Sequence, residues 1–138
     1  MGAPIELVAK VPLFNGMPKR DLERLAQTFK EMTYSAGDTI ASEGQGAVGF
    51  FVIGDGNVTY SVKGQQTGTG GPGGYFGEIA LIDDGPRSAT VTAATDVTAY
   101  GLTSWDFRPV VEENASVAWQ LLQALAKRLR EAQRAAAS

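Results

Sequence analysis

The sequence predicts a mainly β protein with helices at both ends, and three observations lead to this prediction. Glycine is unusually frequent, with 17 of 138 residues, and the glycines gather between Gly37 and Gly85. Between them lie short runs rich in Val, Ile, Thr, Phe and Tyr, the residues that favour strands. Apolar residues recur at helical spacing before and after this region. At 138 residues we expect one domain that spans 1–138.

The N-terminal segment, over about residues 5–31, is predicted to be helical. Leu22, Leu25, Ala26 and Phe29 stand at positions i, i+3, i+4 and i+7, which places one apolar stripe along a helix from Pro18 to Phe29. Pro18 suits the first helical position, where its missing N–H costs nothing. A preceding apolar patch predicts another helical turn, and its members are Val8, Val11, Leu13 and Phe14.

The middle region, over about residues 33–103, is predicted to form a sandwich or barrel of short strands. Glycine-containing turns at 54–56 and 63–64 are typical of hairpins, because glycine accepts a positive φ. The glycine run at 68–74 is interpreted as a loop. The expected strands are Thr39–Ser42, Val48–Ile53, Asn57–Val62, Ser88–Ala94 and Val97–Thr103.

The C-terminal segment, over about residues 104–136, is again predicted to be helical. Ser104 is a candidate cap for a short helix, and Asn114 or Ser116 for a long one that ends near Ala135. Trp105 and Trp119 are expected to be packing residues. Apolar residues recur every four positions along the long helix and form either core or a dimer seam: Val117, Leu121, Leu125 and Leu129.

Composition excludes several classes of function. The chain contains no cysteine and no histidine, which removes thiol catalysis, Ser-His-Asp triads and most transition-metal sites. Its net charge of −3 argues against general nucleic-acid binding. There is neither a signal-peptide pattern nor an apolar run long enough to span a membrane. We therefore expect a cytoplasmic binding module, with no catalytic residues, no metal and no cofactor.

One stretch, residues 75–91, carries chemistry. Gly77 lets the backbone approach a ligand, and the first amides of the apolar turn that follows are suited to an anion. Arg87 supplies a planar cation that fits a phosphate, and Ser88 adds a hydroxyl. Glu78 supplies an acceptor for a sugar hydroxyl. Together these groups predict a site for a compact phosphorylated ribose.

This stretch resembles the phosphate-binding cassette of cyclic nucleotide-binding domains of the catabolite-activator and protein-kinase-A regulatory type. The family pattern Phe-Gly-Glu-(Ile/Leu)-Ala-Leu, a short loop, and Pro-Arg-(Ser/Ala/Thr)-Ala-Thr-Val is matched throughout at 76–81 and 86–91. The resemblance implies an antiparallel β-roll, a jelly-roll-like double-stranded β-helix, with an N-terminal helical segment and C-terminal B and C helices. It also implies a cyclic nucleotide ligand, with cyclic AMP favoured and cyclic GMP left open.

The resemblance implies a role for each matching residue. The cyclic phosphate would be held by backbone amides and by the Arg87 and Ser88 side chains, and Glu78 would accept from the ribose 2′-hydroxyl. The C-terminal helix would close over the base, with Arg128 or Gln133 as candidate base contacts. The implied ligand-binding residues are Phe76, Gly77, Glu78, Ile79, Ala80, Arg87, Ser88 and Ala89.

The sequence departs from the family pattern at two positions, and Ser88 is one of its permitted variants. Gly74 stands where the family usually has Asp, and Gly70 where it has Leu. A glycine at position 70 removes packing and is expected to loosen the strand that leads into the cassette. Ser88 stands where Thr often favours guanine and Ala adenine, so it leaves the base undecided.

Other functions remain as alternatives to a cyclic nucleotide sensor. The chain could be a nucleotide-independent interaction module, or the effector domain of a transcription regulator that lacks its DNA-binding part. A metal-dependent enzyme on a similar barrel is disfavoured, because such enzymes usually hold their metal through histidines. For partners we expect a homodimer through the C-terminal helix or an unidentified effector protein, and neither nucleic acid nor membrane directly.

Overall fold

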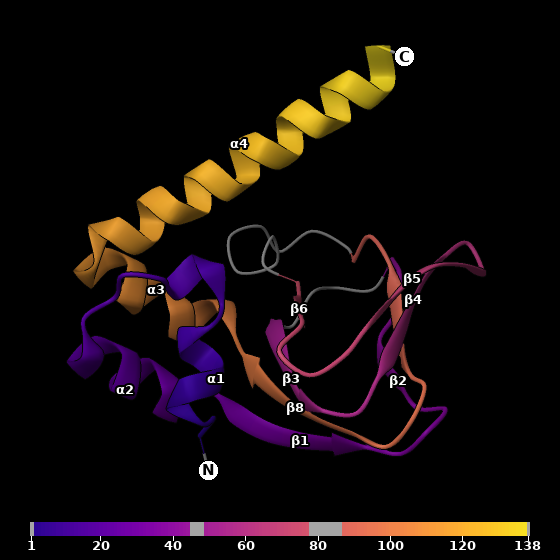
Figure 1. Ribbon diagram of the computed structural model, residues 1–138, viewed down its shortest axis with the longest axis horizontal. Coiled ribbons are helices and arrows are strands. Elements are labelled where there is room, and N and C mark those ends of the chain that lie inside the picture. The colour runs from indigo at the N-terminus through magenta and orange to yellow at the C-terminus, as the bar shows by residue number, and fades with distance from the viewer. Residues whose placement is uncertain (1, 45–48, 78–86, 138) are drawn as a thin grey trace.

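The molecule has a helical side and a strand side, with one long helix that projects beyond both (Figure 1). The computed structural model describes residues 2–44, 49–77 and 87–137. The N-terminal helices are α1 (Ile5–Ala9), the 3₁₀ helix η1 (Pro12–Phe14) and α2 (Lys19–Thr28). The predicted apolar stripe is confirmed, with Leu22, Leu25 and Ala26 buried. Pro18 is the residue before the first turn of α2, not its first helical residue as expected.

The strands form two antiparallel sheets of four, which confirms the predicted β-roll with flanking helices. One sheet has the order β1-β8-β3-β6 and the other β2-β7-β4-β5. Lys63 and Gly64, both with positive φ, form the tight turn between β4 and β5. The strands are β1 (Lys30–Tyr34), β2 (Thr39–Ala41), β3 (Phe50–Asp55), β4 (Val58–Val62), β5 (Gln65–Gly70), β6 (Tyr75–Phe76), β7 (Thr90–Ala93) and β8 (Val97–Leu102).

Three of these strands, β1, β5 and the two-residue β6, are absent from the sequence prediction. β1 is a sheet edge whose first four residues are exposed, so it carries no apolar alternation. β5 is polar and contains Gly68 and Gly70, which were interpreted as loop. The two glycines pair with Tyr60 and Val58 of β4. The Tyr60 ring also fills the space beside Gly70, where a Cβ would lie 2.8 Å from its hydroxyl. Packing lost at Gly70 is thus replaced from β4.

The C-terminal helices are α3 (Ser104–Glu113) and α4 (Ala115–Ala137). The cap of α3 is Thr103, whose Oγ1 accepts a hydrogen bond from the Asp106 amide, so the expectation of Ser104 was one residue late. α4 packs against η1 and α3 through its first half, where Val117 and Leu121 are buried. Trp105 and Trp119 are 67% and 63% exposed, so the expectation that they pack in the core was wrong.

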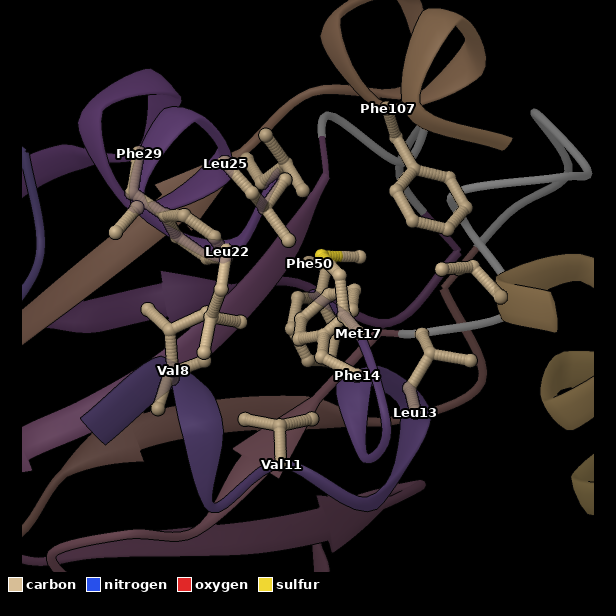
Figure 2. Packing of buried hydrophobic residues seen from close by; sticks show 14 of the residues in the cluster. Val8, Val11, Leu13, Phe14, Met17, Leu22, Leu25, Phe29, Phe50 and Phe107 are labelled. Atoms are coloured by element: carbon tan, nitrogen blue, oxygen red, sulfur yellow. The ribbon is translucent and has the colours of Figure 1, made fainter. Parts of the chain in front are cut away.

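Alternating residues of β3 divide the apolar interior into two clusters. Phe50 and Val52 belong to the helix-facing cluster, and Phe51 and Ile53 to the cluster inside the β-roll. Figure 2 shows the helix-facing cluster, where Phe14 lies among aromatic and aliphatic side chains. Its ring centroid lies 6.1 Å from that of Phe50, in an edge-to-face contact. This cluster fixes the helices to the sheet that also leads into the cassette.

Candidate functional site

The described part of the cassette begins at the end of β6. Phe76 is buried there, and the next residue, Gly77, has a φ of +87°. That backbone conformation is strained for any residue with a Cβ. A Cβ at position 77 would also lie 2.7 Å from the Gly49 carbonyl oxygen and against the Arg87 guanidinium. Glycine at position 77 is therefore required both by backbone conformation and by the close approach of Arg87.

Three predicted ligand-binding residues, Glu78, Ile79 and Ala80, lie outside the described residues. The cassette is described again from Arg87 onward. Ser88 is exposed and Ala89 is partly buried, and both precede β7, which begins at Thr90. The expected strand start at Ser88 is therefore two residues early.

The Arg87 side chain is half-buried and held by two contacts. Its Nη2 donates a hydrogen bond to the Gly49 carbonyl oxygen at 2.6 Å. Its guanidinium carbon lies 5.8 Å from the centroid of the Phe51 ring, within the range of a cation–π interaction. Burial lowers the pKa of Arg87 below its ordinary value, yet arginine stays charged at neutral pH. The contacts therefore place a permanent positive charge against Gly77.

The chain on either side of Ser88 and Ala89 is also tied to the β2 end of the other sheet. The Gly44 amide donates to the Arg87 carbonyl oxygen at 2.9 Å. The Glu43 amide donates to Thr90 Oγ1 at 2.9 Å. These bonds fix the chain before and after Ser88 and Ala89. A fixed backbone is what an anion site built from amides and one guanidinium requires.

Gly49, Phe51, Gly44 and Glu43 were not among the residues predicted for the site. Gly49 and Gly44 act through backbone groups, which leave no residue type to recognise. Phe51 alternates with Val52 in an apolar strand and therefore carries the signal of a core residue. The Arg87 charge and the glycine at position 77 were the parts that the sequence could reveal.

The two candidate base contacts, Arg128 and Gln133, lie together on the exposed half of α4. This half follows the last buried residue of the helix, Leu121. In Figure 1 this half of α4 extends away from the helical side of the molecule. Their role toward a base stays a prediction.

Two findings concern a metal site and a membrane-spanning helix. Within residues 2–44, 49–77 and 87–137, no three carboxylates are grouped so that they could hold a metal ion. In the same part of the chain, no helix has both the length and the apolar character needed to cross a bilayer.

Comparison with known proteins identifies the family. The model of the cyclic nucleotide-binding domain matches residues 31–114. With the β-roll and the Arg87 geometry, this match shows that the chain belongs to the cyclic nucleotide-binding domain family.

Individual relatives agree with this assignment. A cyclic nucleotide-gated potassium channel from Mesorhizobium japonicum is 37% identical over 82% of this chain and 31% of the relative. The cyclic AMP receptor protein of Thermus thermophilus is 31% identical over 88% of this chain and 58% of the relative. The chain thus spans less than two thirds of either relative.

A solved structure matches over nearly its full length. The N-terminal domain of a transcriptional regulator from Streptomyces coelicolor A3(2) is 31% identical, with a TM-score of 0.79. The match covers 94% of this chain and 96% of that domain. The relatives therefore include a channel and regulators, and all three matches cover at least four fifths of this chain.

Proposed function

We propose that this chain is a single cytoplasmic sensor domain without catalytic activity, which binds a cyclic nucleotide, preferably cyclic AMP. The observation that carries the proposal is the Arg87 guanidinium, held against Gly77 by the Gly49 carbonyl and the Phe51 ring. This arrangement places a charged planar donor beside Gly77, within a stretch whose sequence matches the family's cassette. The name of the Thermus thermophilus relative, a cyclic AMP receptor protein, supports cyclic AMP as the ligand.

In this proposal each cassette residue has one role. The Arg87 side chain, the Ser88 hydroxyl and the backbone amides at Gly77, Ile79, Ala80 and Ala89 hold the cyclic phosphate. Glu78 accepts a hydrogen bond from the ribose 2′-hydroxyl, and Phe76 anchors the start of the loop in the core. Arg128 or Gln133 contacts the base when the C-terminal helix closes.

We further propose that binding changes the position of α4. The buried residues of this helix lie in its first half, Leu125 packs partly against the helix-facing cluster, and the described residues after Leu125 are exposed. A ligand shifts such an equilibrium by its different affinity for the two arrangements. The helix also exposes apolar side chains, and Leu122 and Leu129 are 57% and 60% exposed. These residues and Trp119 support a homodimer through α4, with an effector protein as the alternative partner.

The proposal is tested by thermal unfolding of nucleotide-free protein with cyclic AMP, with cyclic GMP and without ligand. At about 100 times the dissociation constant, a ligand that binds only the folded state stabilises it by about 2.7 kcal/mol. For a domain of this size the unfolding midpoint then rises by about 5–10 °C. When the two nucleotides are compared at the same concentration, cyclic AMP should give the larger rise. Sizing the same samples by analytical ultracentrifugation tests the dimer, and a monomer in every sample would contradict it.

Arg87→Ala is the matched variant for this titration. Loss of one partner of a buried charged contact typically costs about 2–5 kcal/mol in binding, so at the same nucleotide concentration the rise in midpoint should fall to about a third or less. A nucleotide-independent interaction module, or an effector domain for some other ligand, would show no rise in the unaltered protein. An equal rise with Arg87→Ala would show that nucleotide binds elsewhere.

A further inference from the structure

We infer that Phe51 is a positioning residue for Arg87: its ring holds the guanidinium beside Gly77 and thereby raises the affinity for the phosphate. This inference rests on the proposed function, and it adds to the site a residue that lies in β3, outside the cassette.

The contact between the two side chains has the geometry of a cation held over an aromatic face. The Arg87 guanidinium carbon is 5.8 Å from the Phe51 ring centroid. Two residues earlier along the chain, the Gly49 carbonyl accepts from Arg87 Nη2 at 2.6 Å. A hydrogen bond to one nitrogen leaves the guanidinium free to rotate about that bond. The ring removes this freedom, so the two contacts together define the orientation.

The Phe51 ring is itself fixed by its neighbours in the sheet. Its cross-strand partners are Phe76 in β6 and Gly101 in β8. The Phe76 ring stacks on it with centroids 5.2 Å apart and planes 20° apart. On the β8 side of the strand, Gly101 has no side chain. The edge of the Phe51 ring lies there, with Cε1 3.1 Å from the place where a Cβ of residue 101 would stand. Phe51 is therefore a rigid platform and cannot follow a moving arginine.

A rigid platform matters because arginine has many rotamers. Ordering a long side chain when an anion arrives reduces the affinity, whereas a side chain held in place beforehand loses little freedom on binding. Arg87 is held by the Gly49 carbonyl, just before β3, and by the Phe51 ring in β3. Phe51 should thus contribute to phosphate affinity through Arg87 without touching the nucleotide.

The inference is tested with Phe51→Leu, with Phe50→Leu as its matched control. Phe50 is the neighbouring buried phenylalanine of β3, and it packs in the helix-facing cluster and against Tyr75, whereas the Arg87 guanidinium lies over Phe51. Both variants remove one ring from the core. Affinities for cyclic AMP and for adenosine, which lacks the phosphate, are measured by calorimetry. We expect Phe51→Leu to weaken cyclic AMP binding about three- to tenfold. Adenosine binding should not change, and Phe50→Leu should change cyclic AMP binding less than about twofold.

The outcomes separate the inference from the proposed function. Equal losses in the two variants, or equal losses for cyclic AMP and adenosine, would overturn the role of Phe51 and leave the sensor intact. If the unaltered protein binds no cyclic nucleotide, the proposed function fails and this inference fails with it. Proton NMR of the unaltered protein needs no variant to fold. The ring current of Phe51 should shift the Arg87 side-chain resonances upfield, and unshifted resonances would also overturn the inference.

Discussion

The two faces of β3 use similar side chains for different purposes. On the helix-facing side, Phe50 packs with Phe14 and Phe29. On the face inside the β-roll, Phe51 stacks on Phe76 and carries the Arg87 guanidinium. The first face stabilises the fold by burying apolar surface, and the second uses the same rigidity to hold a charge.

Two adjacent phenylalanines of one strand, Phe50 and Phe51, therefore have different roles. Phe50 is fully buried, and its ring meets Phe14 of η1, Phe29 just after α2 and Tyr75 of β6. Phe51 is 7% exposed and has a glycine, Gly101, as one cross-strand partner. Removing side chains from the first face should affect mainly the free energy of unfolding. Disturbing the second should also affect ligand affinity.

The largest effect is expected from Phe14→Ala, which breaks the helix-facing cluster. The Phe14 ring is 1% exposed and meets Phe29, Phe50 and Phe107 at centroid distances of 6.5, 6.1 and 6.2 Å. Truncation leaves a cavity at the junction of η1, α2, β3 and α3. We expect the free energy of unfolding to fall by about 3–5 kcal/mol. Urea denaturation followed by circular dichroism measures it.

The same variant tests whether the two faces are independent. The folded fraction of Phe14→Ala should keep its affinity for cyclic AMP, because Arg87 contacts the other face of β3. Phe14→Leu, which retains most of the apolar volume, should cost much less stability. A loss below about 1 kcal/mol for Phe14→Ala, or a strong loss of affinity, would mean that the two clusters do not divide the work as described.

A second prediction concerns Gly101→Ala, which places a methyl group against Phe51 from β8, the strand across β3 from β6. Gly101 has no positive φ, so backbone strain does not enter. A Cβ there would lie 3.1 Å from Phe51 Cε1, which is closer than ordinary contact. We expect a loss of about 1 kcal/mol from overpacking. Displacement of the Phe51 ring should also weaken cyclic AMP binding about two- to threefold.

Gly68→Ala is the control for this prediction. Gly68 also lies within a strand, β5, but a Cβ there would be 3.8 Å from the Tyr60 ring, an ordinary contact. Alanine at position 68 should raise stability by about 0.5–1 kcal/mol, since glycine loses more backbone freedom on folding. If both substitutions stabilise the protein equally, Phe51 has room to move, and the description of it as a rigid platform is wrong.

Much of the fold could be predicted from the sequence, because its strands and helices carry strong local patterns. β3, β4, β7 and β8 were expected because branched and aromatic residues lie between glycine turns. β1 could not be predicted, since its pairing with β8 is a long-range contact and its residues are mostly exposed. The prediction that both tryptophans are packing residues also failed, because their sequence neighbours do not show which helix face is covered. Trp105 and Trp119 lie on helix faces that nothing in the described chain covers.

The site could be predicted only at residues whose type or place in the motif indicates their role. Arg87 was identified by its charge and its place in the motif, and Gly77 by its position before the apolar turn. The Gly49 carbonyl could not be identified, because every residue has one and only the fold selects which one meets the guanidinium. Phe51 could not be distinguished from Phe50, because both have the composition of a core strand.

The smallest effect is expected from Tyr100→Phe, on the helix-facing side of β8. Burial raises the pKa of Tyr100 above its ordinary value of 10.0, and the Glu31 carboxylate on the paired strand raises it further. The unfolded chain therefore ionises before the folded one. The stability contributed by the neutral phenol is complete below pH 10 and is lost as the pH rises toward the raised pKa. Phenylalanine cannot ionise, so this part of the alkaline loss should disappear.

The test is urea denaturation of both proteins at several pH values between about 8 and 11. The two stability curves should run parallel below the ordinary tyrosine pKa and separate above it, with Tyr100→Phe losing less. Some alkaline loss should remain in the variant, because burial also raises the pKa of Tyr34. Glu31→Gln should remove only the smaller, electrostatic part of the shift. Curves that stay parallel throughout would mean that Tyr100 ionises as readily in the folded protein as in the unfolded chain. The helix-facing cluster would then be more open to water at β8 than its packing around Phe14 implies.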